Sequence, residues 1–232
     1  MKISNKISTA LAAAALLLSV SGCAVDNMDA PDCHITGRLI SGDHQVGVRQ
    51  ASGNQLGGSF VKMELWQAGY GKETAQEINV AQDGTFAVDV YAGKVRIIAK
   101  AGVGPWAKAD TLRLDVKKNV DITYPVNAYA VVTEPVIDYD KATGDFSATY
   151  EVILQNSEAA IVQTGIVIND TRFVDTSNQK LQLNAQQKTA GVITVTGNLA
   201  DLDSKRYLFA RAFVKTDKSS YEAYSLQPKQ LR

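Results

Sequence analysis

The chain has few of the residues that build metal sites and disulfides. Only two cysteines and two histidines occur among its 232 residues. A zinc site needs three or four ligands in paired spacing, and His34 and His44 with Asp43 nearby do not meet that need. The sequence therefore predicts no metal and no other cofactor. Cys23 and Cys33 are not expected to form a disulfide, because the residues before Cys23 indicate another use for it.

Neither sign of charge is in excess, and long apolar runs are missing. The 24 Lys and Arg residues balance the 24 Asp and Glu residues. Nucleic-acid-binding proteins carry a basic patch or stripe, so we expect no nucleic acid among the partners. The main apolar run, from Ala10 to Leu18, is shorter than the roughly 20 residues that a membrane-spanning helix needs.

Recognisable catalytic motifs are absent as well. The chain has no Gly-x-Ser-x-Gly elbow and no phosphate-binding loop. Glycosidases work with two nearby carboxylates, but the pair Asp138 and Asp140 flanks a tight turn, and turn chemistry explains it. We therefore expect a protein that is not an enzyme and has no catalytic residues.

The N-terminal residues have the features of an export signal. Lys2 and Lys6 precede the apolar run, and small residues lead from it to Cys23. Residues 20–23 (VSGC) resemble the lipobox of bacterial lipoproteins. That resemblance implies that residues 1–22 are a removed signal peptide, and that Cys23 is acylated on its sulfur and on its new amine.

The residues after Cys23 are polar and acidic. Residues 24–33 read AVDNMDAPDC, so residues 23–33 are predicted to be a lipidated cysteine and a flexible tether. Acidic residues at this place resemble the surface-export signal of glycan-foraging Gram-negative gut bacteria. We therefore expect a lipid-anchored protein of the cell outer membrane that is exposed at the cell surface. A periplasmic position is the alternative.

From His34 onward, apolar residues recur with a period of two, which is typical of strands. Residues 41–59 are rich in Gly, Ser, Gln and Asn and are predicted to be a long loop. Seven short strands at this spacing suggest a β-sandwich over residues 34–127. The strands are expected at residues 34–40, 61–66, 74–80, 86–90, 95–99, 112–116 and 122–126.

The alternation restarts after a predicted boundary near residue 128. Strands are expected there at residues 148–154, 161–168, 193–196 and 207–214. The segment from Leu199 to Val214 resembles the end of a fibronectin-type-III or immunoglobulin-like sandwich, in which a leucine turn precedes a tyrosine-corner strand. Both Tyr207 and Leu208 could occupy the corner, because both faces of the strand are apolar. The expected fold class is all-β, with sandwiches over residues 34–127 and 128–232 in tandem.

The first half carries a more specific resemblance. Residues 83–97 (DGTFAVDVYAGKVRI), after a TGRL strand, resemble the prealbumin-like, carboxypeptidase-regulatory-like sandwich. That resemblance implies that Gly84 lies at a tight turn and that Phe86 fills the core. With the lipobox, the acidic leader and the second sandwich, the whole chain resembles domain-of-unknown-function family 3823. Its members look like outer-membrane lipoproteins that accompany the porin and lid lipoprotein of polysaccharide-uptake systems, which implies an accessory role in glycan capture.

Aromatic residues in loops and on one strand face are the candidate binding residues. Sugars are often held by aromatic faces with polar groups beside them. Trp66, Tyr70 and Trp106 could form such a patch for a polysaccharide or oligosaccharide, or for a neighbouring protein. The alternative is that both tryptophans cap the ends of the sandwich. A structural spacer or adhesin subunit without a small ligand is the alternative function. Thr111, in Asp110-Thr111-Leu112, resembles the O-glycosylation motif of gut bacteria.

Overall fold

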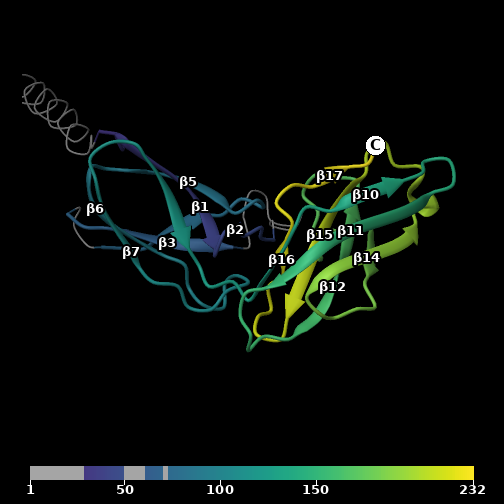
Figure 1. Ribbon diagram of the computed structural model, residues 1–232. Helices are drawn as coiled ribbons and strands as arrows, with labels where there is room; N and C mark the ends of the chain where they lie inside the picture. Colours follow the sequence, from purple (N-terminus) through teal and green to yellow (C-terminus); the bar gives the residue numbers. More distant parts are fainter. Residues whose placement is uncertain (1–28, 50–60, 70–72) are drawn as a thin grey trace, which may run out of the picture.

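The computed structural model describes residues 29–49, 61–69 and 73–232. Two β-sandwiches follow one another along the chain, and they lie end to end along the long axis of the molecule (Figure 1). The predicted all-β class with two tandem sandwiches is confirmed. No helix among the described residues is long and apolar enough to cross a bilayer.

Two sheets of four strands each form the first sandwich. In one sheet, the central strand β1 (Cys33–Ser41) pairs with β2 (His44–Gln45), β5 (Thr85–Val90) and, in parallel, β8 (Val120–Pro125). The order of the other sheet is β4 (Gln76–Asn79), β3 (Lys62–Gln67), β6 (Gly93–Ile98) and β7 (Leu112–Val116). The seven predicted strands are present. The described part of the predicted loop 41–59 also contains β2, which pairs with the end of β1.

Alternating side chains of the two sheets form the first core. Ile35 and Leu39 of β1 and Leu65 and Ile97 of the second sheet are fully buried. Gly37 leaves room in this core, since a Cβ there would lie 2.4 Å from the ring of Phe86. Phe86 is 5% exposed, and Gly84 has a φ of +83° in the turn before it. Both residues occupy the places that the prealbumin-like resemblance implies.

The second sandwich contains β9 to β17. One sheet has the order β10 (Val136–Tyr139), β11 (Asp145–Leu154) and β14 (Gly191–Asn198), and β9 (Ala130–Val132) also pairs with β11. The other sheet has the order β13 (Leu181–Asn184), β12 (Ile161–Asn169), β15 (Phe209–Thr216) and β16 (Ala223–Tyr224). β17 (Lys229–Gln230) pairs with β15.

Strand β15 is buried on both faces. Ala210, Ala212 and Val214 point into the core between the two sheets. Phe209 and Phe213 belong to a smaller cluster on the opposite face, with Val174 and Tyr224. Leu208 is fully buried before the strand, whereas Tyr207 is 44% exposed. Leu208 therefore takes the inward place that the sequence left open between these two residues.

A buried arginine joins the two sandwiches. Arg211 of β15 is inaccessible to solvent. Its guanidinium donates hydrogen bonds to the carbonyl oxygens of Ser225, Val48 (3.0 Å) and Gln82. Val48 and Gln82 belong to the first sandwich, and the guanidinium also lies 4.6 Å from the ring centre of Tyr224. Its hydrogen bonds thus hold two loops of the first sandwich against the second.

Candidate functional site

Trp66 lies on the outer face of the second sheet of the first sandwich. Along β3, Met63 and Leu65 point into the core and are at most 1% exposed. The period of two therefore places Lys62, Glu64 and Trp66 on the opposite face, where all three are half-buried. The expectation that Trp66 shares the outer face with these charged residues agrees with the geometry.

A shallow hollow of about 440 Å³ surrounds the Trp66 indole. Its floor is formed by neighbouring strands: Trp66 is opposite Arg96 of β6, and Arg96 is opposite Arg113 of β7. Residues from the three strands and from the segment after β3 line it. They are Trp66, Ala68, Glu73, Lys94, Val95, Arg96, Arg113, Leu114 and Asp115. An indole ring framed by charged hydrogen-bonding groups is an arrangement that suits a sugar.

Charged neighbours fix the orientation of the indole. The Arg96 guanidinium lies 5.4 Å from the centre of the Trp66 ring and pairs with Glu73 at 2.6 Å. The indole N–H donates a hydrogen bond to Glu64 at 3.3 Å, and Lys100 pairs with the same carboxylate. The hydrogen bond from Lys100, with a smaller contribution from Trp66, holds the pKa of Glu64 below its usual value. Trp66 is therefore held in place before any ligand arrives.

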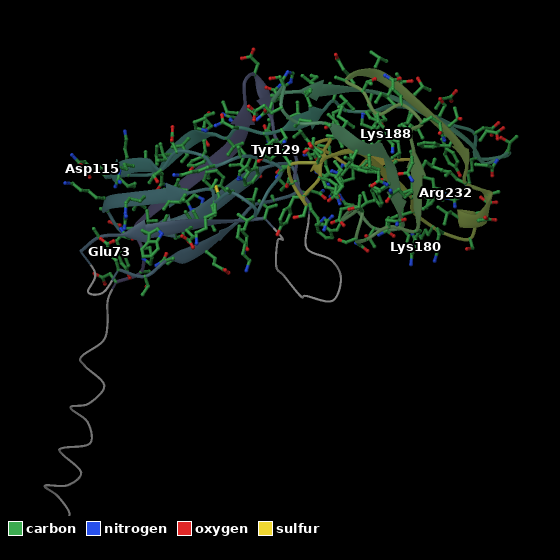
Figure 2. The ribbon with its side chains drawn as sticks, turned by 90° about the horizontal axis from the view of Figure 1, so that it is seen from below. Glu73, Asp115, Tyr129, Lys180, Lys188 and Arg232 are labelled. Carbon is green, nitrogen blue, oxygen red and sulfur yellow. The ribbon has the colours of Figure 1, made fainter. Side chains whose placement is uncertain are left out.

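The hollow lies at the end of the first sandwich that is most distant from the second. Glu73 and Asp115 mark this end in Figure 2, and Tyr129 marks the junction of the two sandwiches. The start of the described chain lies at the same end, because Asp32 accepts a hydrogen bond from the backbone N–H of Ala92, next to β6. The hollow and the predicted tether therefore share one end of the molecule.

Trp106 does not contribute to this hollow. It is 1% exposed, and its indole N–H donates to the carbonyl oxygen of Lys100 at 3.1 Å. Gly104 lies under the ring, and Trp106 forms a β-bridge with Ala128 near the second sandwich. The hypothesis of an exposed patch that includes Trp106 is corrected here, because the ring caps the end of the core instead. This was the alternative considered for both tryptophans.

Three other residues were predicted as site residues, and the structure describes only one of them. Tyr70 and Cys23 lie outside the described residues. Thr111 is exposed in the segment directly before β7, where a modifying enzyme could reach it. Its O-glycosylation stays a prediction.

No group of three or more His, Cys, Asp or Glu side chains within the described ranges could hold a metal ion. His34 pairs instead with Asp89 at 2.6 Å on the outer face of β1. Cys33 is 4% exposed and is a free thiol. Burial and the neighbouring Asp32 raise the pKa of the Cys33 thiol, so it is less reactive than an ordinary surface cysteine.

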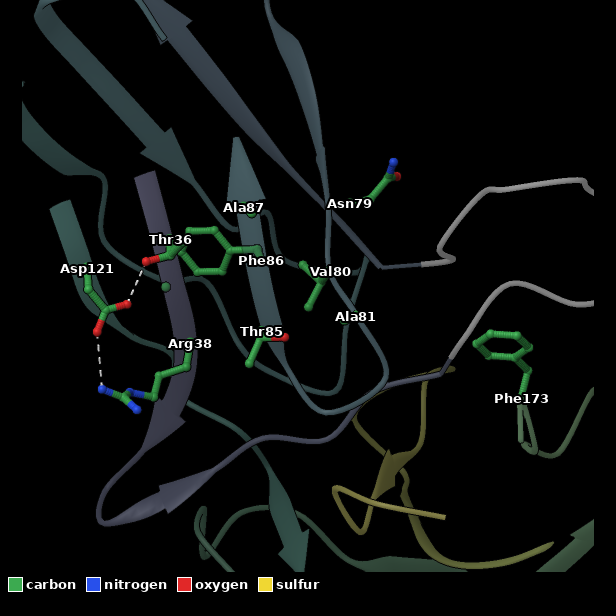
Figure 3. Close-up of a pocket in the computed structure, with 11 residues that line it drawn as sticks. Thr36, Arg38, Asn79, Val80, Ala81, Thr85, Phe86, Ala87, Asp121 and Phe173 are labelled. Carbon is green, nitrogen blue, oxygen red and sulfur yellow. Dashed lines mark hydrogen bonds and ion pairs between the residues drawn. The ribbon is translucent and has the colours of Figure 1, made fainter. Parts of the chain in front are cut away.

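A second hollow, of about 640 Å³, lies where the outer face of β1, β5 and β8 meets the second sandwich. Figure 3 shows Thr36 and Arg38 directed toward Asp121, to which they are hydrogen-bonded at 2.8 and 3.4 Å. Phe173 of the second sandwich also lines this hollow and is 55% exposed. No pattern in the sequence pointed to Phe173, because it lies in a connection between strands and only the packing of the two sandwiches brings it here.

Comparison with known proteins decides the family. Residues 33–127 match the family model described as "Protein of unknown function (DUF3823) N-terminal domain". The chain carries the DUF3823 N-terminal domain. The resemblance to this family that the sequence indicated is thereby confirmed. No curated protein matches the chain.

Solved structures of DUF3823 proteins have the same fold. One from Parabacteroides merdae is 21% identical, with a TM-score of 0.76 and coverage of 88% of this chain and 100% of that chain. One from Bacteroides ovatus is 24% identical, with a TM-score of 0.73 and coverage of 86% and 98%. A candidate carbohydrate-binding protein from Bacteroides uniformis is 15% identical, with a TM-score of 0.64 and coverage of 87% and 99%. At these identities the likeness concerns the fold, and it extends over both sandwiches.

Proposed function

We propose that this DUF3823 protein is a non-catalytic, lipid-anchored protein of the bacterial outer membrane that binds glycan at the hollow around Trp66. The single observation that carries the proposal is the oriented, half-exposed indole in a hollow of about 440 Å³. Its rim supplies guanidinium, ammonium and carboxylate groups that can hydrogen-bond sugar hydroxyls.

The sequence supports the cellular part of the proposal. The lipobox residues 20–23 and the acidic residues after Cys23 indicate an exported lipoprotein. The fold is shared with a candidate carbohydrate-binding protein from Bacteroides uniformis. A role beside the porin and lid lipoprotein of a polysaccharide-uptake system belongs to this proposal, and it would place the bound glycan next to its transporter.

The proposal is tested by affinity electrophoresis and calorimetry on a panel of soluble polysaccharides. We expect at least one glycan to retard the protein, and we expect Trp66→Ala to abolish the effect, because it removes the stacking surface. Tyr207→Ala is a matched control: this exposed ring on the second sandwich also lies against an arginine, with Arg206 5.1 Å from its centre. It should bind like the unaltered protein.

The results separate the proposal from its alternatives. Loss of binding in Phe173→Ala with full binding in Trp66→Ala would place the site at the second hollow. Absence of retention by any glycan would reject glycan binding and favour the structural spacer or adhesin subunit. Hydrolysis of a panel member would reject the non-catalytic role.

A further inference from the structure

We infer that the hollow around Trp66 selects acidic saccharides, with the oxyanion of the sugar held by Arg113. This inference rests on the proposed glycan-binding function and adds the class of ligand. Carboxylate and sulfate groups share the chemistry on which it depends, because both present two or more oxygens to a guanidinium fork.

The first step is the arrangement of the two arginines. Arg96 and Arg113 are directly opposite each other in the ladder of β6 and β7. The period of two puts both side chains on the outer face, and both line the hollow. Like charges directly opposite on neighbouring strands repel one another. An anion between or beside them would remove this repulsion.

The second step is how each guanidinium is neutralised. Arg96 has an anionic partner in Glu73, at 2.6 Å, and lies over the Trp66 ring. Arg113 forms no ion pair and no side-chain hydrogen bond with any residue that the structure describes. Its five N–H donors are therefore available beside an oriented indole.

The third step is the remaining charge of the rim. Lys94 also lines the hollow and, within the described part of the chain, forms no ion pair. Asp115 lies opposite Lys94 in the strand ladder and is 3.7 Å from Lys117. The lining thus holds three cations, Lys94, Arg96 and Arg113, and two carboxylates, Glu73 and Asp115, which leaves an excess of one positive charge.

These features together define a ligand with two parts. The pyranose ring packs on the exposed part of Trp66, and a carboxylate or sulfate on that sugar or its neighbour accepts the hydrogen bonds of Arg113. Neutral sugars would offer the Arg113 donors hydroxyl groups only, and a hydroxyl lacks the Coulomb attraction that an oxyanion adds to the hydrogen bonds. The hollow should therefore prefer the charged member of any pair of otherwise identical glycans.

The test uses such pairs with the full chain purified in detergent. Polygalacturonate is compared with its methyl ester, and dextran sulfate with dextran, by calorimetry at low and at physiological salt. We expect the charged member to bind at least tenfold more tightly, and we expect added salt to reduce the difference. The pair that responds identifies the oxyanion as carboxylate or sulfate.

Variants of Arg113 decide whether the hollow is responsible. Arg113→Gln should lower the affinity for the acidic glycan about tenfold or more, and Arg113→Lys should retain part of it, because the charge remains without the fork. Arg206→Gln, an exposed arginine on the second sandwich, is the matched control and should change nothing. Both positions are on the surface, so thermal unfolding of the three variants should stay close to that of the unaltered protein.

Failure of this inference can be told from failure of the proposed function. Equal binding of neutral and acidic glycans, lost in Trp66→Ala and unchanged in Arg113→Gln, would overturn the inference and leave glycan binding intact. Binding of no glycan would overturn both. Arg113-dependent binding to phosphatidylglycerol vesicles without binding of any saccharide would also overturn both, and it would make this face a contact for a lipid surface.

Discussion

Trp66 and Trp106 have the same side chain in opposite environments. The first is half-exposed over a sheet face, and the second is 1% exposed at the end of the core. The hydrogen bonds differ in the same way. Trp66 donates to the carboxylate of Glu64, whereas Trp106 donates to a backbone carbonyl of Lys100. At the scale of residues, Trp66 is therefore the one of these two tryptophans whose ring can contact a ligand without unfolding part of the domain.

This contrast predicts that truncation of the two tryptophans lowers stability by different amounts. Trp106→Ala should lower the free energy of unfolding by about 3–5 kcal/mol, because it leaves a large cavity in the core. Trp66→Ala should lower it by less than about 1 kcal/mol, since the ring is only partly buried. Urea unfolding followed by circular dichroism measures both values. A loss of 3 kcal/mol or more in Trp66→Ala would mean that Trp66 is a core residue and would weaken its assignment to the site.

The protonation of Glu64 should determine how the site responds to acid. The pKa of Glu64 is lowered from an ordinary 4.5, chiefly by the hydrogen bond from Lys100. A carboxyl group with a lowered pKa stabilises the folded state above its ordinary pKa, and this stabilisation is lost as the pH falls through the lowered value. Trp66 should therefore lose its fixed orientation as the pH falls through the lowered pKa of Glu64.

Tryptophan fluorescence between pH 7 and pH 3 measures this change. We expect a transition in the unaltered protein that is absent in Glu64→Gln, which cannot ionise. The variant Glu77→Gln is the control, because this carboxylate lies on the neighbouring strand β4 and pairs with Lys62 rather than with the Trp66 network. Identical titrations of the unaltered protein and Glu64→Gln would refute the prediction.

At the scale of elements, strands with an alternation or a run of apolar residues were predictable, and very short or weakly patterned strands were not. β5 and β6 follow turn signals and alternate clearly, so the sequence placed them within two residues. β2, β16 and β17 have two residues each, which is too short for a period to show. β10 and β13 were missed because neither has a fully buried face in its burial pattern.

The site was predictable in the same partial way. The alternation around Met63 and Leu65 indicates that Trp66 faces outward, because the register of one strand fixes its faces. Nothing in one strand reveals which side chains of β6 and β7 stand opposite it. Arg96 and Arg113 could therefore be assigned to the site only from the pairing of the strands. The burial of Trp106 likewise depends on its bridge to Ala128, twenty-two residues later in the chain.

The junction of the sandwiches provides a prediction at this scale. Burial lowers the pKa of Arg211 to about 10, so the side chain still carries its charge at neutral pH. Arg211→Met would leave the buried carbonyl groups of Ser225 and Val48 without their donor, whereas the Gln82 carbonyl would keep its hydrogen bond from the backbone N–H of Val48. Each such loss costs about 1–3 kcal/mol. We expect a total loss of at least about 2 kcal/mol in the free energy of unfolding, and unfolding of the two sandwiches in separate transitions.

Scanning calorimetry tests this expectation. Arg206→Met is the control, because Arg206 is exposed and contacts only the neighbouring Tyr207 ring among the interactions described. It should shift the midpoint very little. A single cooperative transition in Arg211→Met at the midpoint of the unaltered protein would show that the junction does not depend on this side chain.

At the scale of the whole molecule, the proposed anchor and the proposed site belong to the same end. Asp32 is hydrogen-bonded next to β6, and β6 supplies Arg96 to the hollow. Ten residues, from Cys23 to Asp32, span at most about 35 Å of extended chain. A protein lipidated at Cys23 would therefore keep the end that carries the hollow within reach of the membrane. Glycan bound there would be within reach of a membrane-embedded partner.

The proposed membrane attachment depends on the acyl chains at Cys23, so replacing Cys23 should release the protein. The chain from Cys23 onward has 22 basic and 24 acidic side chains (24 − 2 = 22), so its charge gives no attraction to anionic lipid. Each buried methylene of an acyl chain contributes about 0.8 kcal/mol to membrane binding. Cys23→Ser should therefore move the protein from the membrane fraction to the soluble fraction and abolish incorporation of labelled palmitate.

Cys33→Ser is the matched control for this prediction, since its thiol is buried in the first core. It should leave both measurements unchanged, whereas a Cys23→Ser protein that stays in the membrane fraction would show that contacts other than the lipid hold it there.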